Sequence, residues 1–261
     1  MRGSQRGQRR ISQTAGDRRT IRMSTVKLLN SFVSPFASRV RLAIYAHDLP
    51  VEIAPSGQWT EDFQKSPDYL AINPIGRVPT LILDDGSALP ESTVIIEYLA
   101  DAFPDVGLRP MSAEAAAKDR LLAHLIEIYV QERANPLFPQ VFAKQRDADK
   151  ILATVAAMNT GLSHLNHFME GESYRADRAI TTADCALIVY LFFFAECMVR
   201  ALDQPAIIAN HPRIAAYWQA MQGAPAAQRV LGEMRTAIAQ SRLKMLVSSP
   251  DRAGLEQQLT T

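Results

Sequence analysis

The sequence is short of cysteine, of long apolar runs and of net charge, and each shortage excludes a class of protein. Only two of its 261 residues are cysteines, Cys185 and Cys197. They lie twelve positions apart and fit neither a zinc motif nor a disulfide framework, which favours a reducing, cytoplasmic location. The longest apolar run, at residues 186–195, is well short of the roughly 20 residues that a spanning helix needs. We therefore expect no membrane segment, and we interpret this run as a buried core helix.

The small net charge hides an uneven distribution. The chain carries 28 Lys and Arg against 27 Asp and Glu, yet residues 1–22 alone hold seven arginines and one acid. The rest has 21 basic and 26 acidic side chains, and no basic stripe that would bind nucleic acid. Residues 1–22 lack the apolar core of a secretory signal and have too few apolar residues for an amphipathic transit peptide. We expect them to form a disordered tail.

Hydrophobic patterning divides the rest of the chain into two regions. Between residues 26 and 104, short apolar runs alternate with helix-like segments, which predicts a small α/β domain with a mixed sheet. Asp85-Gly86 separates two of these runs and is typical of a hairpin turn. Residues 112–245 show long helical periodicity and predict an all-α domain, followed by a C-terminal tail at 246–261. The helices expected there cover residues 113–135, 147–170, 182–202 and 212–221.

The stretch NSFVSPFASRVRLA, at residues 30–43, places a Ser-Pro pair at the start of a helix-like segment. We interpret Ser34 as the helix N-cap and Pro35 as the first helical residue, because this pairing satisfies an orphan backbone donor and fixes φ. Most Ser-Pro junctions have only that structural role. A second role for Ser34 needs support from the rest of the sequence.

Two further segments of the first domain place backbone and polar groups where a ligand can use them. In NPIGRVPTL, at residues 73–81, a proline stands at the start of an apolar strand. A cis Val78–Pro79 bond there would turn the Val78 backbone outward to pair with a peptide-like ligand. Glu91 and Ser92 open the next helix, where the hydroxyl, the backbone donors and the helix dipole favour a carboxylate, and where Glu91 can hold an ammonium. The alternative for Glu91-Ser92 is a plain cap.

Together these segments resemble the glutathione transferase family over residues 26–245. SPFASRVRLA is similar to the Ser-Pro-Phe motif of the tau class and the Cys-Pro-Phe motif of the omega class, and zeta-class enzymes place their catalytic serine at the position of Ser34. NPIGRVPTL resembles the Asn-Pro...Val-Pro segment of the family, and PESTVIIEYL its Glu-Ser helix start. TTADCAL resembles the capping box of the family, with Thr181 as cap and Asp184 at the third helical position. The resemblance implies a thioredoxin-like first domain, an all-helical second domain and a homodimer.

The resemblance also implies that Ser34 is catalytic. A serine hydroxyl has one donor and two acceptor lone pairs, so it can accept from the helix backbone and still donate to the glutathione sulfur, favouring thiolate over thiol. No neighbouring base in sequence would make Ser34 itself the nucleophile. Serine in place of the omega-class cysteine cannot form a mixed disulfide, which argues against thiol transferase activity. Ser31, at the strand end, and Ser38, one turn inside the helix, are the alternatives.

Glutathione is accordingly the expected co-substrate, and no metal is expected. By resemblance, the glutathione-binding residues are Phe36, Lys65, Arg77, Val78, Pro79, Glu91 and Ser92. Lys65 would pair with the glycine carboxylate, and Glu91-Ser92 would hold the γ-glutamyl group. The acceptor pocket is expected at Tyr129, Arg133 and Phe138. His164 and His167 share one helix face, but no carboxylate or thiolate completes a metal set, so we interpret them as surface or dimer-face residues.

The expected function is that of an enzyme that transfers glutathione sulfur to a small hydrophobic electrophile, typically in detoxification. Conjugation, dehalogenation, ether cleavage and double-bond isomerisation all start from the same thiolate, and the sequence does not choose among them. The alternative is a non-catalytic protein of the same fold that serves as a ligand-binding or protein-interaction module. The joint presence of Ser34, Val78-Pro79 and Glu91-Ser92 favours the enzyme.

Overall fold

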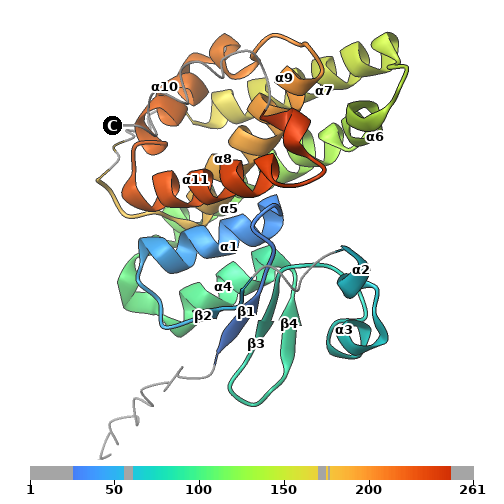
Figure 1. Cartoon of the computed structure of the whole chain (residues 1–261). Helices are drawn as coiled ribbons and strands as arrows, with labels where there is room; N and C mark the ends of the chain where they lie inside the picture. Colours follow the sequence, from blue (N-terminus) through green and yellow to red (C-terminus); the bar gives the residue numbers. More distant parts are fainter. Residues whose placement is uncertain (1–25, 56–60, 170–174, 176, 248–261) are drawn as a thin grey trace, which may run out of the picture.

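A computed structural model describes residues 26–55, 61–169, 175 and 177–247. The tail expected at residues 1–22 lies outside this part of the chain, as do all but the first two residues of the tail expected at 246–261. Figure 1 shows a region that contains a small sheet on one side of a larger group of helices.

Four short strands form the mixed sheet that the alternation predicted. The strand order is β2-β1-β3-β4, in which β1 pairs in parallel with β2 and antiparallel with β3, and β3 pairs antiparallel with β4. The β3–β4 connection is the expected hairpin, and its Gly86 has a φ of +81°, a conformation that glycine adopts without a side-chain clash. The strands cover Lys27–Leu29 (β1), Glu52–Ile53 (β2), Thr80–Ile82 (β3) and Ala88–Pro90 (β4).

The helices follow two arrangements. Those interleaved with the strands cover Pro35–Ala46 (α1), Glu61–Gln64 (α2), Pro67–Ile72 (α3) and Ser92–Ala102 (α4). The later α-helices cover Ala113–Ile126 (α5), Leu137–Phe142 (α6), Ala148–Phe168 (α7), Thr182–Tyr190 (α8), Val199–Ala201 (α9), Pro212–Met221 (α10) and Pro225–Ala239 (α11). Two π-helical segments cover Glu127–Gln131 (η3) and Leu191–Met198 (η5), and 3₁₀ turns cover Pro104–Val106 (η2), Glu132–Ala134 (η4), Ile208–Asn210 (η6) and Lys244–Leu246 (η7). The sequence did not single out α11, although Pro225 at its first position is a start signal.

Two of the expected long helices change geometry partway. The helix expected over 113–135 is α-helical to Ile126 and then continues as η3 and η4, while the helix expected over 182–202 becomes π-helical in η5. The change from α5 to η3 occurs where α7 packs closely against this segment. A Cβ added at Gly161 of α7 would lie only 2.0 Å from the Tyr129 carbonyl oxygen. Hydrophobic periodicity cannot show where an α-helix becomes a π-helix when the segment is apolar on every face.

The helix that begins at Thr182 is buried, as its composition predicted. From Thr182 to Ala201 it is long and apolar enough to cross a membrane, but 94% of its most apolar window is covered by protein. The predicted capping box is present: the Thr181 side chain accepts from the Asp184 N–H, and the Asp184 carboxylate accepts from the Thr181 N–H. This helix is therefore a core element whose first turn is closed by its own side chains.

Helix α1 lies at the junction between the sheet region and the helical group. It packs against α4 within the first region and against α8 and α11 of the second, as Figure 1 shows. Two arginines of α1, Arg39 and Arg41, are fully buried at this junction, although arginine side chains are mostly exposed in proteins. Arg41 is held by Asn30, Ser38 and Glu233, so one end of its network lies on α11.

Candidate functional site

Ser34 has the capping geometry that the Ser-Pro pair predicted. Its backbone is extended, with φ −74° and ψ 121°, and its Oγ accepts a hydrogen bond from the Ala37 N–H at 3.2 Å. Among the residues that the structure describes, no group accepts a hydrogen bond from the Ser34 O–H. Ser38 differs, because it is buried, donates to the Ser34 carbonyl and accepts from Arg41. Ser34 thus keeps a donor at the positive end of α1, and Ser38 does not.

The segment before β3 also matches its prediction. The Val78–Pro79 peptide bond is cis. The preceding carbonyl, that of Arg77, accepts hydrogen bonds from Tyr69 Oη at 2.6 Å and from Asn73 Nδ2 at 2.9 Å. Tyr69 and Asn73 are buried, and sequence reasoning assigned neither of them a role. They fix the backbone directly before Val78.

The start of α4 is not a plain cap. Glu91 occupies the N-cap position without a side-chain cap bond, and Ser92 is the first helical residue. Glu91 has φ +71° and ψ 111°, and a non-glycine residue in such a conformation costs about 1 to 3 kcal/mol. Ser92 is buried beside it, at 6% exposure. Backbone donors of this first turn are left without a capping side chain, which suits an incoming anion.

Lys65 and Arg77 are exposed on the connections around α3. Lys65 follows α2, and its backbone N–H donates to the Asp62 carbonyl. Arg77 directly precedes the cis bond. Both cations therefore belong to the same region as Val78 and Pro79.

Four aromatic rings connect the candidate glutathione side to the candidate acceptor side. Phe36, on α1 next to the Ser-Pro pair, lies edge-on to Tyr190 with 5.8 Å between ring centroids. Tyr190 lies 5.5 Å from Phe194, whose ring is 6.5 Å from that of Phe138. Phe36 and Phe138, which the sequence proposed separately, are thus linked through the two intervening rings of Tyr190 and Phe194. The sequence did not predict a role for Tyr190 and Phe194, because both belong to the apolar run at residues 186–195 that was interpreted as a buried core helix.

The other two candidates for the acceptor pocket, Tyr129 and Arg133, come earlier in the chain than Phe138, in η3 and η4. Tyr129, in η3, is 40% exposed and packs against the His164 ring of α7 at 5.6 Å. Arg133 is exposed in η4. The ring contacts of the described residues do not join Tyr129 to the four rings above. Within the same residues, no group of three or more His, Cys, Asp and Glu side chains gathers to hold a metal ion.

A buried arginine joins the elements that carry these residues. Arg39 Nη1 donates to Thr93 Oγ1 at 3.1 Å, to Tyr190 Oη at 3.0 Å and to Glu127 Oε1. Burial acts to lower the pKa of Arg39, but Tyr190 and Glu127 together raise it above its ordinary value. Because one nitrogen binds oxygens of α4, η3 and α8, Arg39 fixes the starts of α1 and α4 against the helical group. Sequence reasoning used Arg39 only as a motif marker.

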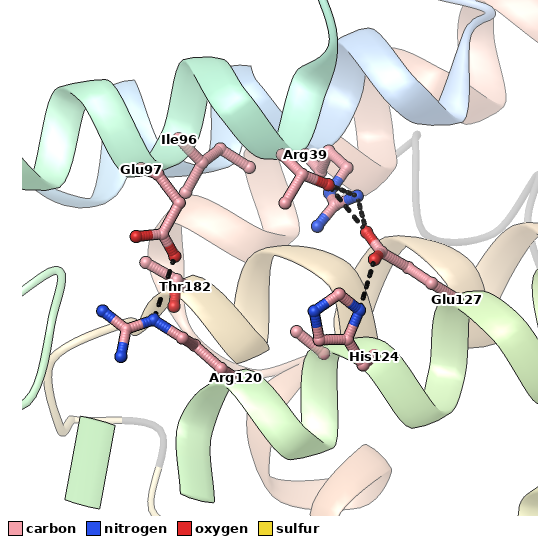
Figure 2. A pocket seen from close by; sticks show the side chains of 9 residues that line it. Arg39, Ile96, Glu97, Arg120, His124, Glu127 and Thr182 are labelled. Atoms are coloured by element: carbon pink, nitrogen blue, oxygen red, sulfur yellow. Dashed lines mark hydrogen bonds and ion pairs between the residues drawn. The ribbon is translucent and has the colours of Figure 1, made fainter. Parts of the chain in front are cut away.

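A cavity of about 250 Å³ lies beside this arginine, between α4 and α5. Figure 2 shows Arg39 and Glu127 at one end of it and the Glu97–Arg120 pair at the other, with His124 turned toward Glu127. The remaining lining is Thr93, Ile96, Ala123 and Thr182. Opposite charges balance along its walls, so it shows no bias toward an anion or a cation.

Comparison with known proteins agrees with this arrangement. A family model for the glutathione S-transferase N-terminal domain matches residues 33–102. Glutathione S-transferase 3 of Zea mays is 25% identical over 222 residues, which cover 80% of this chain and 94% of that protein. The structure of glutathione S-transferase III in its apo form is 27% identical, with a TM-score of 0.63, and the match covers 79% of this chain and 95% of that one.

A glutathione S-transferase of Methylobacillus flagellatus KT, solved with glutathione bound, shares the fold. It is 23% identical, with a TM-score of 0.63, and the match covers 79% of this chain and 98% of that one. A small mixed sheet of thioredoxin-like type followed by a helical region is the architecture that these proteins have in common. The family model and the relatives named above are those of glutathione transferases, the family that the chain resembles over about four fifths of its length.

Proposed function

We propose that the protein is a glutathione transferase, which activates glutathione as a thiolate at Ser34 and transfers the sulfur to a small electrophile. The observation that carries the proposal concerns the Ser34 hydroxyl. Its oxygen accepts a hydrogen bond from the Ala37 N–H, and its own hydrogen is still available to donate to a ligand. A donor at the N-terminus of a twelve-residue helix stabilises negative charge on a nearby sulfur. The proton of the thiol leaves to solvent, and the thiolate lone pair forms a C–S bond with the electrophile. In a substitution the leaving group departs to solvent with the electron pair of the broken bond, and in an addition the electrophile takes up a proton from solvent.

The remaining glutathione contacts are proposed on the two segments beside Ser34. Glu91 would bind the γ-glutamyl ammonium, and Ser92 with the first-turn donors of α4 would bind its carboxylate. The backbone of Val78, next to Pro79, would pair with the cysteinyl part. Lys65 is proposed for the glycine carboxylate, and Arg77 is a second cation near the same loop.

The acceptor would lie between Phe36 and Phe138. Phe36 is 37% exposed and Phe138 is half-buried, so both rings offer apolar surface to a ligand. An aromatic wall of this kind suits a small hydrophobic electrophile. Tyr129 and Arg133 are proposed at the outer edge of the same pocket. We place the protein in the cytoplasm as a homodimer, with residues 26–104 binding glutathione and residues 112–245 carrying the acceptor pocket.

A panel of electrophiles tests the proposal. Glutathione would be incubated separately with an activated aryl halide, an epoxide, an α-haloketone, a β-aryl ether and an unsaturated carbonyl, and loss of free thiol and product formation would be followed with and without protein. Catalysis of any of these reactions, abolished or strongly reduced in Ser34→Ala, supports the enzyme. Tight binding of glutathione with no turnover across the panel would instead support the non-catalytic module.

A further inference from the structure

The backbone of Ser34 is anchored on both sides. Its N–H donates to the Ser31 carbonyl at 3.1 Å. Its carbonyl accepts two hydrogen bonds from Ser38, one from the backbone N–H at 3.0 Å and one from the hydroxyl at 2.8 Å. Because the Ala37 N–H also holds Ser34 Oγ, the freedom left to this side chain is rotation of its own O–H bond. The place of the proposed catalytic oxygen therefore depends on Ser38.

Arg41 fixes the direction in which the Ser38 hydroxyl donates. Arg41 Nη2 donates to Ser38 Oγ at 2.8 Å and so occupies one lone pair of that oxygen. Ser38 is fully buried, so its O–H cannot turn toward bulk water, and its hydrogen goes to the Ser34 carbonyl. The arginine thus holds the Ser38 oxygen where its hydrogen reaches the backbone of Ser34.

Three further contacts hold the Arg41 guanidinium itself. Nη1 donates to Asn30 Oδ1 at 3.0 Å, and Cζ lies 4.1 Å from the centroid of the Phe32 ring. Nε lies 3.6 Å from Glu233 Oε2 on α11, which packs along α1 (Figure 1). Asn30 is fixed in turn, because its Nδ2 donates to the Ala54 carbonyl at 2.9 Å. The end of β1, the loop that follows it and the helical group together set the place of this arginine.

The burial of Arg41 is not explained by stability. Its side chain is 0% exposed, and burial lowers its pKa to about 10 against the opposing effects of Glu233 and Tyr45. Apolar residues of similar volume often stabilise a protein at least as well as a buried ion pair. A serine that bonds the carbonyl four residues earlier, as Ser38 does, also slightly destabilises its helix. Both features are expected where the position of a backbone group matters for function.

We propose that Arg41 is a positioning residue for Ser34, which acts through Ser38 and sets where the Ser34 hydroxyl lies relative to the glutathione sulfur. The inference rests on the proposed function, because it requires that Ser34 stabilise the thiolate. A misplacement of about 1 Å in a reacting group can cost roughly 100-fold in rate. Release of the Ser34 backbone should therefore weaken the donor to the sulfur and leave the rest of the glutathione site unchanged.

Ser38→Ala tests the link, because it removes only the oxygen that joins Arg41 to the Ser34 carbonyl. The pKa of bound glutathione, read from thiolate absorbance across pH, should rise. Turnover at saturating glutathione should fall about tenfold, part of the loss that a misplaced group can cause. The Kd of glutathione, measured by calorimetry, should stay within about twofold of the wild type, because the proposed contacts at Glu91 and Ser92 are untouched.

Ser163→Ala is the matched control. The Ser163 hydroxyl donates to the Asn159 carbonyl at 3.1 Å, the same bond to the fourth preceding residue that Ser38 makes. It lies on α7, which carries none of the residues proposed to bind glutathione. This variant should keep the turnover and the thiolate pKa of the wild type. A purely structural role for Ser38 predicts a lowered melting temperature with an unchanged thiolate pKa in Ser38→Ala, which would overturn the inference.

Arg41→Met tests the arginine itself. Methionine has no donor, and Glu233 keeps Arg229 and Tyr45 as partners at 3.3 and 3.1 Å, so no isolated charge is left behind. This variant should raise the pKa of bound glutathione, and combined with Ser38→Ala it should give the same pKa as Ser38→Ala alone. Additive shifts would overturn the inference. If Arg41→Met does not fold, Ser38→Ala and its control decide the question.

A second pair of substitutions separates this inference from the proposed function. In a Ser34→Ala protein, Ser38→Ala should have no further effect on the pKa of bound glutathione, and a further rise would overturn the inference. An unshifted thiolate titration in Ser34→Ala would overturn the proposed function together with the inference. A shifted titration in Ser34→Ala with an unshifted one in Ser38→Ala would overturn the inference alone.

Discussion

Ser34 Oγ accepts the Ala37 N–H at 3.2 Å, and this single bond satisfies a backbone donor at the start of α1 without consuming the serine hydrogen. The cap and the catalyst are therefore compatible in one side chain. A substitution that removes the hydroxyl should affect stability and chemistry separately, and each can be measured.

Ser34→Ala should reduce turnover by about 30- to 1000-fold, because losing one donor to a developing anion costs about 2 to 4 kcal/mol. The pKa of bound glutathione, read from thiolate absorbance across pH, should rise. Glutathione affinity should change much less, since Glu91, Ser92 and the Val78 backbone are proposed to hold the peptide. Loss of the cap should cost about 1 kcal/mol of stability.

The control for the cap is Ser112→Ala. Ser112 is the N-cap of α5 and accepts the Ala115 N–H at 3.1 Å, away from the proposed site. It should lose comparable stability and keep full turnover. An unshifted thiolate titration in Ser34→Ala, together with a lowered melting temperature, would show that Ser34 is a cap alone. Ser34→Cys should instead gain disulfide exchange and lose conjugation.

Gly161→Ala should destabilise the protein by about 1 to 3 kcal/mol, as overpacking does. The added Cβ would lie 2.0 Å from the Tyr129 carbonyl oxygen, so α7 or η3 has to move. Gly232→Ala is the control, because a Cβ at that position on α11 meets nothing within 4 Å. That variant should gain about 0.5 to 1 kcal/mol from helix propensity. Chemical denaturation of both proteins checks the prediction, which fails if their stabilities shift in the same direction.

Glu196→Gln should change how stability depends on pH. Burial raises the pKa of Glu196, against the opposing effects of Arg200, Trp218 and Arg235. Between the unfolded value of about 4.3 and the higher folded value, the native state binds more protons than the unfolded state. Stability of the wild type is therefore lost as pH rises through that window.

The glutamine variant lacks this loss and can still accept the Trp218 indole N–H, which Glu196 Oε1 accepts at 3.1 Å. Its melting temperature relative to the wild type should increase with pH across the window. Glu132→Gln, at an exposed position of η4, controls for removal of a charge. A constant difference between Glu196→Gln and the wild type at all pH values would contradict the assignment.

Light scattering at micromolar concentration should give the mass of a dimer. Val94 on α4, Leu121 on α5 and Ile128 on η3 expose 48%, 38% and 41% of their surface, an apolar set on neighbouring elements that a second subunit would cover. Leu121→Asp should shift the mass toward the monomer if these residues lie in the interface. A monomeric wild type would refute the dimer.

Local signals made much of this fold predictable. The Ser34-Pro35 pair, the Thr181 capping box, the Asp85-Gly86 hairpin and the Val78–Pro79 segment each act over a few residues, so their sequence patterns carry their geometry. The mixed sheet was predictable as well, because the order of strand-like and helix-like segments along the chain can be read directly from the sequence.

The links between the two regions were not predictable in the same way. Arg39 meets Glu127 and Tyr190 from 88 and 151 positions away, and nothing near it in sequence indicates that a helix arginine will be buried. Tyr190 was hidden for the opposite reason, since a run that is apolar on all sides gives no sign that one hydroxyl in it has polar partners. Long-range polar contacts of this kind become visible only when the chain is folded.

The backbone of Glu91 sets a limit on how this protein can be engineered. With φ at +71°, this position would be relieved of strain by glycine, which adopts positive φ readily. A library selected only for heat resistance should therefore enrich Glu91→Gly and, with it, lose the carboxylate proposed to hold the ammonium of glutathione. Selection for thermostability and selection for catalysis would pull this one residue in opposite directions, as occurs where a folded chain keeps a strained conformation for the sake of a ligand.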